Sequence, residues 1–440
     1  MKPVSSLADL CVKCNICTAA CPVAAVSDEF LGPKAVGPQA ERFRHPQWAA
    51  TDPSVTLCSG CGVCSRVCPH GVPVAELNIQ AKAQLASQRG VPLRDRLIAR
   101  PAMLGALAQP LAPLANTALR ARPAMLGALA RPLAPLANAA LRARPARVLA
   151  ETFLGLSRSA PMPKFSGRTF RSLETALQLE SPPPPGSRPQ LAYFHGCSVN
   201  YYEPGLGRLA LRVLACLGYD VCLPPQGCCG LPLQSNGQFA AARRYAQTNV
   251  RTLAPFAAAG VPIVGTSTSC TLALKHDYRA ILGLETEQAD LLANAVYDIF
   301  EFLRDAEPNP LEGTTFIPVP LRLLYHAPCQ LNSHGIGLPA YDVLRRIPEL
   351  SLTLSESECC GVAGTYGLKR ERYSVAHAVG SSLFDQVRQT QPDLMVTDSE
   401  TCRWWVQGHT GVRACHPLEV LALALGLHDG EDPLGKKAAA

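Results

Sequence analysis

Cysteine is the residue type in this chain whose number and spacing most clearly indicate chemistry. Eight of the nineteen cysteines form two runs of the pattern C-x2-C-x2-C-x3-C-P, namely Cys11, Cys14, Cys17 and Cys21 before Pro22, and Cys58, Cys61, Cys64 and Cys68 before Pro69. Thiolates are soft ligands that select zinc or iron–sulfur clusters. Three closely spaced thiolates can surround one cube of iron and sulfide, while the fourth reaches a neighbouring cube. The two runs therefore predict two [4Fe–4S] clusters.

The ligand set of each cluster follows from how such paired runs are used. The spacing is that of bacterial two-cluster ferredoxins, in which the fourth cysteine of each run binds the other cluster. This rule predicts one cluster held by Cys11, Cys14, Cys17 and Cys68, and a second held by Cys58, Cys61, Cys64 and Cys21. Two structural zinc sites are the alternative, because C-x2-C pairs also bind zinc. Fully thiolate-bound clusters leave no open position for a substrate, so we expect them to carry electrons.

A second motif, Cys-Cys-Gly, occurs twice in the carboxy-terminal half, at Cys228-Cys229-Gly230 and at Cys359-Cys360-Gly361. A disulfide between adjacent residues is not expected, because a relaxed bridge needs Cα atoms about 4.4–6.8 Å apart and a specific torsion. Glycine permits a tight turn of the backbone. Adjacent thiols on such a turn can reach neighbouring iron atoms.

Single cysteines stand at matching distances on both sides of the two pairs. Cys197 lies 31 positions before Cys228, and Cys329 lies 30 positions before Cys359. Cys270 lies 41 positions after Cys229, and Cys402 lies 42 positions after Cys360. The candidate third cluster site is thus Cys197, Cys228, Cys229 and Cys270, and the candidate fourth is Cys329, Cys359, Cys360 and Cys402. Buried, inert cysteines are the alternative.

Three cysteines and two histidines remain near these motifs. Cys216, Cys222 and Cys415 have no counterpart in the other half, and we expect them in the core. The sequence Phe194-His195 before the first site resembles Tyr325-His326 before the second. Each histidine is either a donor that tunes its site or a loop residue with unrelated partners.

The cysteines of this half are embedded in a βα pattern, in which short apolar runs alternate with amphipathic segments. Strands are expected in 191–197, 261–267, 321–329 and 393–399, and helices in 205–217, 271–282, near 341–346 and after Lys369. The two halves read as copies of one module. Ligand sites of such parallel sheets lie beyond the carboxyl ends of the strands, where thiols distant in sequence can converge. The predicted fold class is a two-cluster, ferredoxin-like α-helical domain followed by a duplicated α/β cysteine-rich domain.

A basic segment joins these parts and contains a tandem duplication. The copies cover 100–121 and 122–143, a period of 22 residues, and no acidic residue lies between Asp95 and Glu151. The prolines divide each copy into short helical pieces. The segment is either a linker on the protein surface or an apolar and arginine-rich surface for anionic lipid. We divide the chain into a two-cluster domain (1–95), this linker (96–190, ending in a proline-rich connector), two cysteine-rich domains (191–315 and 316–428) and a tail (429–440).

The composition excludes several classes of protein. A formal charge of +7 is modest for 440 residues, and no basic and aromatic pattern predicts nucleic-acid binding. No apolar run reaches the ~18 residues that a membrane-spanning helix requires. Clustered cysteines in a long chain without a signal-peptide pattern indicate metal binding rather than a disulfide scaffold. The segment "GLGRLA" at Gly205 is only a fragment of a dinucleotide fingerprint, so no flavin or nicotinamide site is predicted.

The doubled Cys-Cys-Gly module behind a two-cluster domain resembles the heterodisulfide-reductase-related iron–sulfur family. The resemblance covers nearly the whole chain and includes "GPKAVGPQAERFR", "FHGCSVNYYEPGLG", "CCGLPLQSNG", "YHAPCQL", "CCGVAGTYGLKRERY" and "HPLEVLA". Related modules close each site with C-x-x-C, whereas this chain has Ser267 before Cys270 and Ser399 before Cys402. Each half therefore offers four thiols and not five, which implies one or two further clusters of ordinary type.

The longer phrases imply a role within that family. They resemble a subunit that docks at the cytoplasmic face of the inner membrane, takes electrons from a flavoprotein that oxidises sn-glycerol 3-phosphate, and passes them to menaquinone. No catalytic residue is then expected in this chain. The alternatives are the iron–sulfur subunit of a glycolate or lactate oxidase, and a catalyst that reduces a disulfide at the carboxy-terminal sites.

Overall fold

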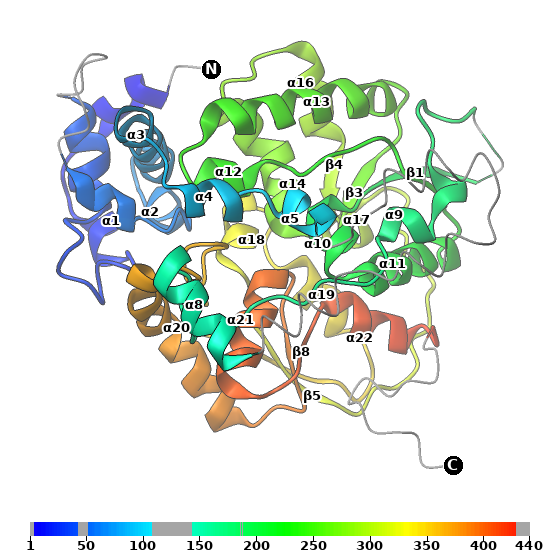
Figure 1. Cartoon of the computed structure of the whole chain (residues 1–440). Helices are drawn as coiled ribbons and strands as arrows, with labels where there is room; N and C mark the ends of the chain where they lie inside the picture. Colours follow the sequence, from blue (N-terminus) through cyan, green and yellow to red (C-terminus); the bar gives the residue numbers. More distant parts are fainter. Residues whose placement is uncertain (1–3, 43–51, 108–142, 185, 187, 428–440) are drawn as a thin grey trace.

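The fold is seen in a computed structural model, which describes residues 4–42, 52–107, 143–184, 186 and 188–427 (Figure 1). The amino-terminal part is built from short helices around one long one. These are η1 (Val4–Leu10), α1 (Ile16–Ala19), η2 (Ala35–Gln39), η3 (Pro53–Leu57), α2 (Val63–Arg66) and α3 (Val74–Arg89). The described residues of this part form no strand, in agreement with the expected helical domain.

Helix α3 supports both cysteine runs. Its apolar side chains recur at Val74, Leu77, Ala81 and Leu85, a helical stripe that lies on one face. Val74 and Leu77 pack in one small core with Cys17 and Cys64. Ala81 and Leu85 pack in a second core with Cys21. One helix therefore sets the relative position of the two runs.

The first α/β half is a four-stranded parallel sheet in the order β2-β1-β3-β4. Its strands are β1 (Gln190–Phe194), β2 (Asp220–Cys222), β3 (Ile263–Gly265) and β4 (Val296–Asp298). Its helices are α10 (Gly196–Tyr201), α11 (Pro204–Cys216), α12 (Leu231–Ser235), α13 (Phe239–Ala258), α14 (Thr268–Leu272), η5 (Ala273–Asp277), α15 (Tyr278–Ala280), α16 (Glu287–Ala295) and α17 (Ile299–Asp305).

The second half repeats this topology, with strand order β6-β5-β7-β8 and every pairing parallel. The strands are β5 (Arg322–Tyr325), β6 (Ser351–Leu354), β7 (Leu394–Val396) and β8 (Ala414–Cys415). The helices are α18 (Cys329–His334), α19 (Pro339–Leu344), α20 (Arg370–Thr390), α21 (Glu400–Thr410) and α22 (Pro417–Ala424). The duplication predicted from the cysteine spacing is thus a duplication of fold.

The two sheets share one apolar core. In β1, Leu191 and Tyr193 face this shared core, while Ala192 and Phe194 face the core beneath α13 and α16. In β5, Leu323 likewise faces the shared core, and its neighbour Leu324 turns to a core beneath α20 and α21. Such strands are apolar on both faces because helices cover both, as is usual for parallel sheets. The shared core holds the halves in a fixed relation.

Most of the expected elements are present, with some displaced boundaries. The helix expected over 271–282 starts earlier, at Thr268, and a helix rather than a loop follows β1 from Gly196. Cys222 and Cys415 are buried, as predicted. The prediction for Cys216 is wrong, because this residue ends α11 on its exposed side, away from the buried stripe that includes Ala210 and Leu214.

The connecting segment contributes α4 (Leu93–Ile98), α5 (Pro101–Leu107), α8 (Arg144–Leu154), α9 (Phe170–Leu173) and η4 (Thr175–Leu177). Most of the 22-residue duplication, over 108–142, lies outside the described residues. After α8 the chain runs beside the start of α20, where Ser157 N donates to Leu368 O at 2.8 Å and Arg370 N donates to Gly155 O at 2.8 Å. Within the described ranges no helix is long and apolar enough to cross a membrane.

Candidate iron–sulfur sites

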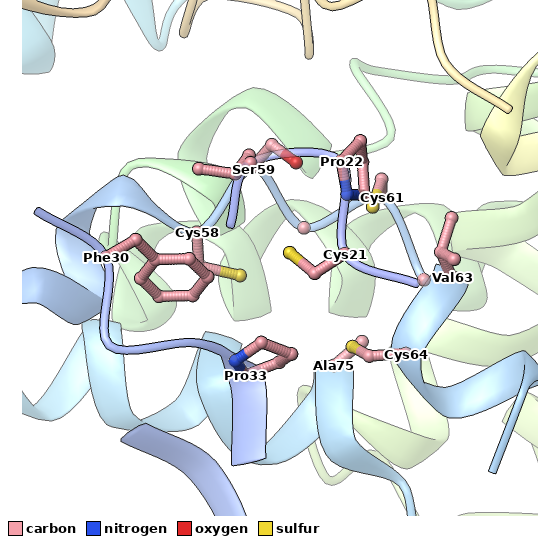
Figure 2. Close-up of a pocket in the computed structure, with 13 residues that line it drawn as sticks. Cys21, Pro22, Phe30, Pro33, Cys58, Ser59, Cys61, Val63, Cys64 and Ala75 are labelled. Carbon is pink, nitrogen blue, oxygen red and sulfur yellow. The ribbon is translucent and has the colours of Figure 1, made fainter. Parts of the chain in front are cut away.

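The eight amino-terminal cysteines surround two pockets. One, the Cys58 pocket, is lined by Cys21, Cys58, Cys61 and Cys64, together with apolar residues such as Phe30 and Pro33 (Figure 2). The other, the Cys11 pocket, is lined by Cys11, Cys14, Cys17 and Cys68. The fourth cysteine of each run thus crosses to the pocket of the other run. Each pocket contains about 310 Å³ of space free of protein atoms, part of it open to solvent, so the two can hold groups of similar size.

The backbone of both runs is turned in the same way by residues with positive φ. Lys13 (φ 64°) and Asn15 (φ 73°) occupy the places in the first run that Gly60 (φ 71°) and Gly62 (φ 80°) occupy in the second. Asn15 and Gly62 then cap the short helices α1 and α2. Glycine takes this conformation freely, and asparagine does so more easily than other side chains. The matching turns bring three sulfur atoms of each run to one side.

The pocket environment suits a cluster bound by thiolates. Burial raises the pKa of Cys21 to about 11, and the charge of Cys58 from the other run adds to this. Burial likewise raises the pKa of Cys17, as do the charges of Cys11, Cys68 and Cys14. Bare thiolates so close together repel each other, and bound cations remove that repulsion. The donors therefore fit iron–sulfur clusters.

Positive charge is placed beside the Cys58 pocket. The ammonium group of Lys82 donates to the carbonyl oxygen of Cys58 at 3.1 Å. Burial lowers the pKa of Lys82 to about 8, against the attraction of Cys58. A nearby cation favours the more negative, reduced state of a cluster. Spacing rules did not identify Lys82, because it lies on α3 outside the cysteine runs.

In the first α/β half the structure brings Cys197, Cys228, Cys229 and Cys270 together. All four are buried, and they follow the carboxyl ends of β1, β2 and β3. The pKa of Cys228 lies well below its usual value because its sulfur accepts hydrogen bonds from Cys197 and Cys229. The amide of Gly230 also donates to the Cys228 sulfur, at 3.5 Å.

Side chains hold the first Cys-Cys-Gly turn in place. Asn249 donates to the Cys228 carbonyl at 3.0 Å, and the Tyr278 hydroxyl donates to the Cys229 carbonyl at 3.0 Å. Asn249 and Tyr278 are also bonded to each other at 2.9 Å. Sequence reasoning missed both residues, because each lies in a helix where the spacing of apolar residues indicated only packing.

The second half repeats the arrangement with Cys329, Cys359, Cys360 and Cys402. The pKa of Cys359 lies well below its usual value because of hydrogen bonds from Cys329 and Cys360, and Gly361 N donates to its sulfur at 3.3 Å. The sulfurs of Cys360 and Cys402 are 2.9 Å apart. Here the backbone of α20 packs directly on the turn: a Cβ atom on Gly361 would lie 2.0 Å from Ala376 O.

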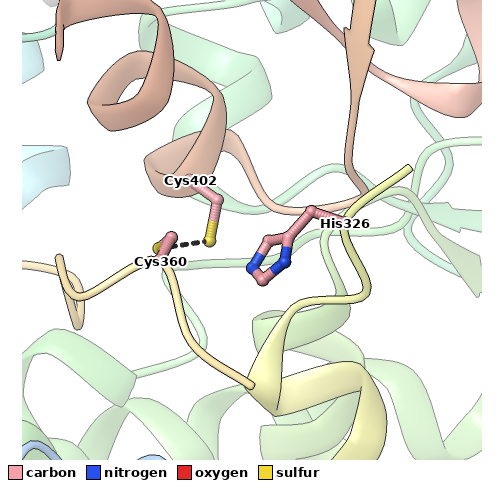
Figure 3. A group of neighbouring side chains, drawn as sticks. All are labelled: His326, Cys360 and Cys402. Atoms are coloured by element: carbon pink, nitrogen blue, oxygen red, sulfur yellow. Dashed lines mark hydrogen bonds between the residues drawn. The ribbon is translucent and has the colours of Figure 1, made fainter. Parts of the chain in front are cut away.

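His326 joins the second site. Its ring faces the Cys360 and Cys402 thiols, and one ligand atom from each of the three residues lies within 4.8 Å of the others (Figure 3). The hydrogen bond from Cys360, followed by the contact with His326, lowers the pKa of Cys402 to about 6. The three residues are fully buried or nearly so.

The sequence suggested that His195 and His326 are equivalent residues of the two halves, but comparison of the halves shows that they are not. Tyr325 lies 132 positions after Tyr193, as Cys329 does after Cys197 and Cys402 after Cys270. Both tyrosine hydroxyls bond to the loop after the third strand, Tyr193 to Thr266 Oγ1 at 2.8 Å and Tyr325 to Asp398 Oδ2 at 2.6 Å. His326 is therefore equivalent to Phe194, not to His195. The ring of His195 packs against Phe170 instead.

Ser267 and Ser399, which stand three positions before Cys270 and Cys402, are buried and form hydrogen bonds. Ser267 Oγ donates to Glu400 Oε2 at 3.1 Å, and Ser198 Oγ donates to Glu400 Oε1 at 2.6 Å. Ser399 Oγ accepts from Cys402 N at 3.5 Å. Glu400, from the second half, thus reaches the residues beside the first thiol site, a bridge that no local pattern indicated.

The Cys58 pocket and the second thiol site are neighbours. Burial raises the pKa of Cys61, and the largest charge contribution after burial comes from Cys359. Ser333 Oγ, in α18, lies 3.4 Å from the carbonyl oxygen of Cys61. Arg66 forms an ion pair with Glu358, next to Cys359. Two sites that are distant in the sequence are therefore adjacent in the fold.

Comparison with known families identifies the two kinds of domain. Residues 7–72 match the model of a 4Fe-4S dicluster domain. Residues 191–275 and 323–407 each match the model of a cysteine-rich domain named CCG. The amino-terminal part therefore carries two [4Fe–4S] clusters, as predicted, and not zinc. The repeated cysteine-rich domain indicates further iron–sulfur clusters.

Several proteins are similar to this chain over most of its length. The subunit designated C of the anaerobic glycerol-3-phosphate dehydrogenase of Escherichia coli (strain K12) is 35% identical over 94% of this chain and 98% of its own length. The subunit designated B of the fumarate reductase (CoM/CoB) of Methanothermobacter marburgensis is 26% identical over 94% of this chain and 72% of its own length. The glycolate oxidase iron-sulfur subunit of Escherichia coli (strain K12) is 25% identical over 96% of this chain and 95% of its own length.

Proposed function

The chain belongs to the family of the anaerobic glycerol-3-phosphate dehydrogenase subunit designated C, and from this membership we propose that it passes electrons from a flavoprotein partner to the menaquinone pool. The chain is an iron–sulfur electron-transfer subunit of this dehydrogenase family. The proposal adds that the partner oxidises sn-glycerol 3-phosphate to dihydroxyacetone phosphate. Hydride chemistry then takes place on the partner, and this chain conducts electrons.

The observation that carries the proposal is the adjacency of the Cys58 pocket and the second thiol site, where Ser333 Oγ lies 3.4 Å from Cys61 O and Arg66 pairs with Glu358, next to Cys359. A conducting subunit needs redox centres that lie near one another, whereas a catalyst needs a centre open to substrate. Cys359, Cys360 and Cys402 are buried, so the second thiol site favours conduction.

We assign the ligands as the pockets group them. The ferredoxin-type pair consists of one cluster on Cys11, Cys14, Cys17 and Cys68 and one on Cys58, Cys61, Cys64 and Cys21. A third centre would use Cys197, Cys228, Cys229 and Cys270, and a fourth Cys329, Cys359, Cys360 and Cys402. When bound, these groups supply reversible one-electron storage, and the thiols and nearby amides fix their position.

A surface for peripheral docking at the membrane is proposed on α8. Its outer side exposes Leu149 and Phe153, the latter with 78% of its surface accessible. Arg144 at the start of the helix and Arg158 just beyond it are exposed. An apolar face flanked by arginines suits the interface of a membrane with anionic lipid. We propose that through this surface the chain docks at the cytoplasmic face of the inner membrane, beside the quinone pool.

The test supplies the anaerobically purified chain with alternative donors. It is mixed with the flavoprotein subunits of a glycerol-3-phosphate dehydrogenase and sn-glycerol 3-phosphate, and separately with a glycolate-oxidising flavoprotein and glycolate. Reduction of the clusters and of a menaquinone analogue in the first mixture alone is expected. Reduction only with glycolate would replace the proposed partner, and reduction of a disulfide by the isolated chain with viologen as donor would replace conduction by catalysis.

A further inference from the structure

The imidazole of His326 is held by its backbone at the edge of the second thiol site. The residue follows β5 directly and is completely buried. Its amide donates to Val396 O at 2.9 Å, which continues the pairing of β5 with β7. Its Nδ1 lies 3.0 Å from Ser355 Oγ. Its Nε2 is buried and has no hydrogen-bond partner among the described residues.

We propose that His326 is itself a ligand of the metal centre in the second half, where Nε2 supplies a fifth donor beside the four thiols. This inference rests on the proposal that Cys329, Cys359, Cys360 and Cys402 hold an iron–sulfur centre. It goes beyond that proposal because it makes the two carboxy-terminal centres chemically different.

The hydrogen bonds around the ring favour ligation. A metal-binding histidine usually donates its other ring N–H to a fixed acceptor, which sets both tautomer and orientation. Ser355 Oγ can be that acceptor for Nδ1, and the lone pair of Nε2 then faces Cys360 and Cys402. An unpaired buried nitrogen is unfavourable without a partner. A metal bound between the three groups would satisfy it.

The closing serine does not provide the missing donor. Ser399 Oγ accepts the Cys402 amide at 3.5 Å and lies 3.2 Å from Thr401 Oγ1, as expected for a residue that caps α21. His326, by contrast, lies directly after β5, and its ring is on the side of the Cys402 sulfur (Figure 3). The imidazole is therefore better placed than the serine to complete the ligand set.

The first half has no equivalent donor among its described residues. Phe194 occupies the position of His326. His195 also has a buried Nε2 without a partner among the described residues, but its Nδ1 lies 2.7 Å from Gly196 O. Its ring centroid lies 5.3 Å from that of Phe170, and it forms no group with the described thiols there. The first centre then has four thiols alone.

The difference has a direct electronic consequence. A neutral imidazole as fifth donor leaves the ligand set one charge less negative than a fifth thiolate would, and histidine ligation raises the potential of [2Fe–2S] centres. The second-half site lies beside the Cys58 pocket, since Ser333 contacts Cys61 and Arg66 pairs with Glu358. We therefore expect it to attract electrons from the amino-terminal clusters more strongly than a centre with five thiolates would.

The test detects the nitrogen directly in the whole chain. The protein is produced anaerobically with ¹⁵N-histidine and natural nitrogen elsewhere, and electron spin echo modulation is recorded in each redox state that is paramagnetic. A coupled ¹⁵N nucleus is expected in the wild type. It should be lost in His326→Phe, which copies Phe194, and retained in His195→Ala, which copies Ala327. In His326→Cys the iron content should persist, the coupling should vanish and the midpoint potential should fall.

Iron and sulfide counts separate the two proposals. More than about eight irons per chain with no histidine coupling in the wild type would overturn ligation by His326 and leave electron conduction intact. Coupling that survives His326→Phe would also overturn it. About eight irons and no more would overturn the second-half centre and the ligation together. Should His326→Phe fail to fold by circular dichroism, the labelled wild type and His326→Cys still decide the question.

Discussion

The hydroxyl of Ser333 lies 3.4 Å from the carbonyl oxygen of Cys61, although 272 positions separate the two residues. Ser333 is in α18, the helix that begins with Cys329. Cys61 belongs to the loop that lines the Cys58 pocket. The contact therefore ties a helix of the second thiol site to the amino-terminal clusters. Val375 and Val379 of α20 also pack against the core around Cys21, which strengthens the same junction.

Loss of a single thiol should reveal which cluster lies beside the second half. Cys14→Ser and Cys61→Ser should each lower the iron content by about four atoms, the content of one cube. Only Cys61→Ser should shift the midpoint potential of the second-half centre, because Cys61 contacts Ser333 of the second half and Cys14 lies in the other pocket. Redox titration followed by EPR measures both effects. An equal shift in both variants would contradict the arrangement.

The two Cys-Cys-Gly turns should differ in their tolerance of a side chain. Gly361 and Gly230 have nearly equal positive φ values, 90° and 89°. A Cβ atom would lie 2.0 Å from Ala376 O in the second turn but 3.2 Å from Ala242 O in the first. We expect Gly230→Ala to cost about 1–3 kcal/mol from backbone strain and Gly361→Ala clearly more. Urea unfolding measures the difference in free energy of unfolding. Equal losses would show that backbone strain, and not the close approach of Ala376 O, determines the cost.

The ion pair between Glu203 and Arg403 should be important for docking of the two halves. The Arg403 side chain is 5% exposed, and Glu203 also accepts from Trp404 Nε1 at 2.9 Å. Glu203→Ala leaves a buried guanidinium without its carboxylate, which should cost about 3–5 kcal/mol. Glu203→Gln should cost less because it keeps an acceptor oxygen.

The matched control for this pair is Glu174, which pairs with Arg208 at 2.9 Å where the arginine side chain is 61% exposed. Glu174→Ala should cost less than about 1 kcal/mol. Free energies of unfolding in urea test all three variants. A Glu203→Ala loss as small as that of Glu174→Ala would refute the role of the pair.

Acid should destabilise the protein through His416. Its Nδ1 accepts from Leu418 N at 3.0 Å, and Nε2 lies 3.0 Å from Thr266 O in the other half. Burial, with the charge of Arg403, holds the pKa of His416 well below 6.5. The unfolded chain binds the proton first, so the free energy of unfolding falls as pH drops below about 6.5, by at most about 1.4 kcal/mol per pH unit.

His416→Asn is the variant for this test, because asparagine can still cap α22 but does not titrate. Chemical unfolding between about pH 7.5 and about pH 5 should give a shallower loss of stability in the variant than in the wild type. Parallel curves would mean that His416 is not the group that takes up the proton.

Membrane docking by α8 can be tested on its apolar face. The double variant Leu149→Ser and Phe153→Ser should reduce binding to vesicles with anionic lipid by at least about tenfold, since each side chain loses ~1–2 kcal/mol of apolar transfer energy. Iron content should not change, because both side chains are exposed. Cosedimentation measures binding. Leu291→Ser, an exposed leucine on α16, serves as the control. Unaltered binding by the double variant would exclude this face.

Local sequence determined the cysteine chemistry of this protein. The repeated spacing of Cys11 to Cys21 and of Cys58 to Cys68 specifies both cluster type and turn geometry, because thiolate spacing and left-handed turns are properties of a few adjacent residues. The matching intervals between cysteines in the two halves likewise predicted that the α/β module is duplicated.

Only the tertiary structure decided which sites are neighbours and which polar residues support them. Ser333 meets Cys61, and Glu400 reaches Ser198, through packing of segments from separate parts of the chain. His326 and His195 looked equivalent in the sequence, but an extra residue between His326 and Cys329 turns only His326 toward the thiols. A contact between distant segments depends on the whole shared core, so no local spacing rule can predict it.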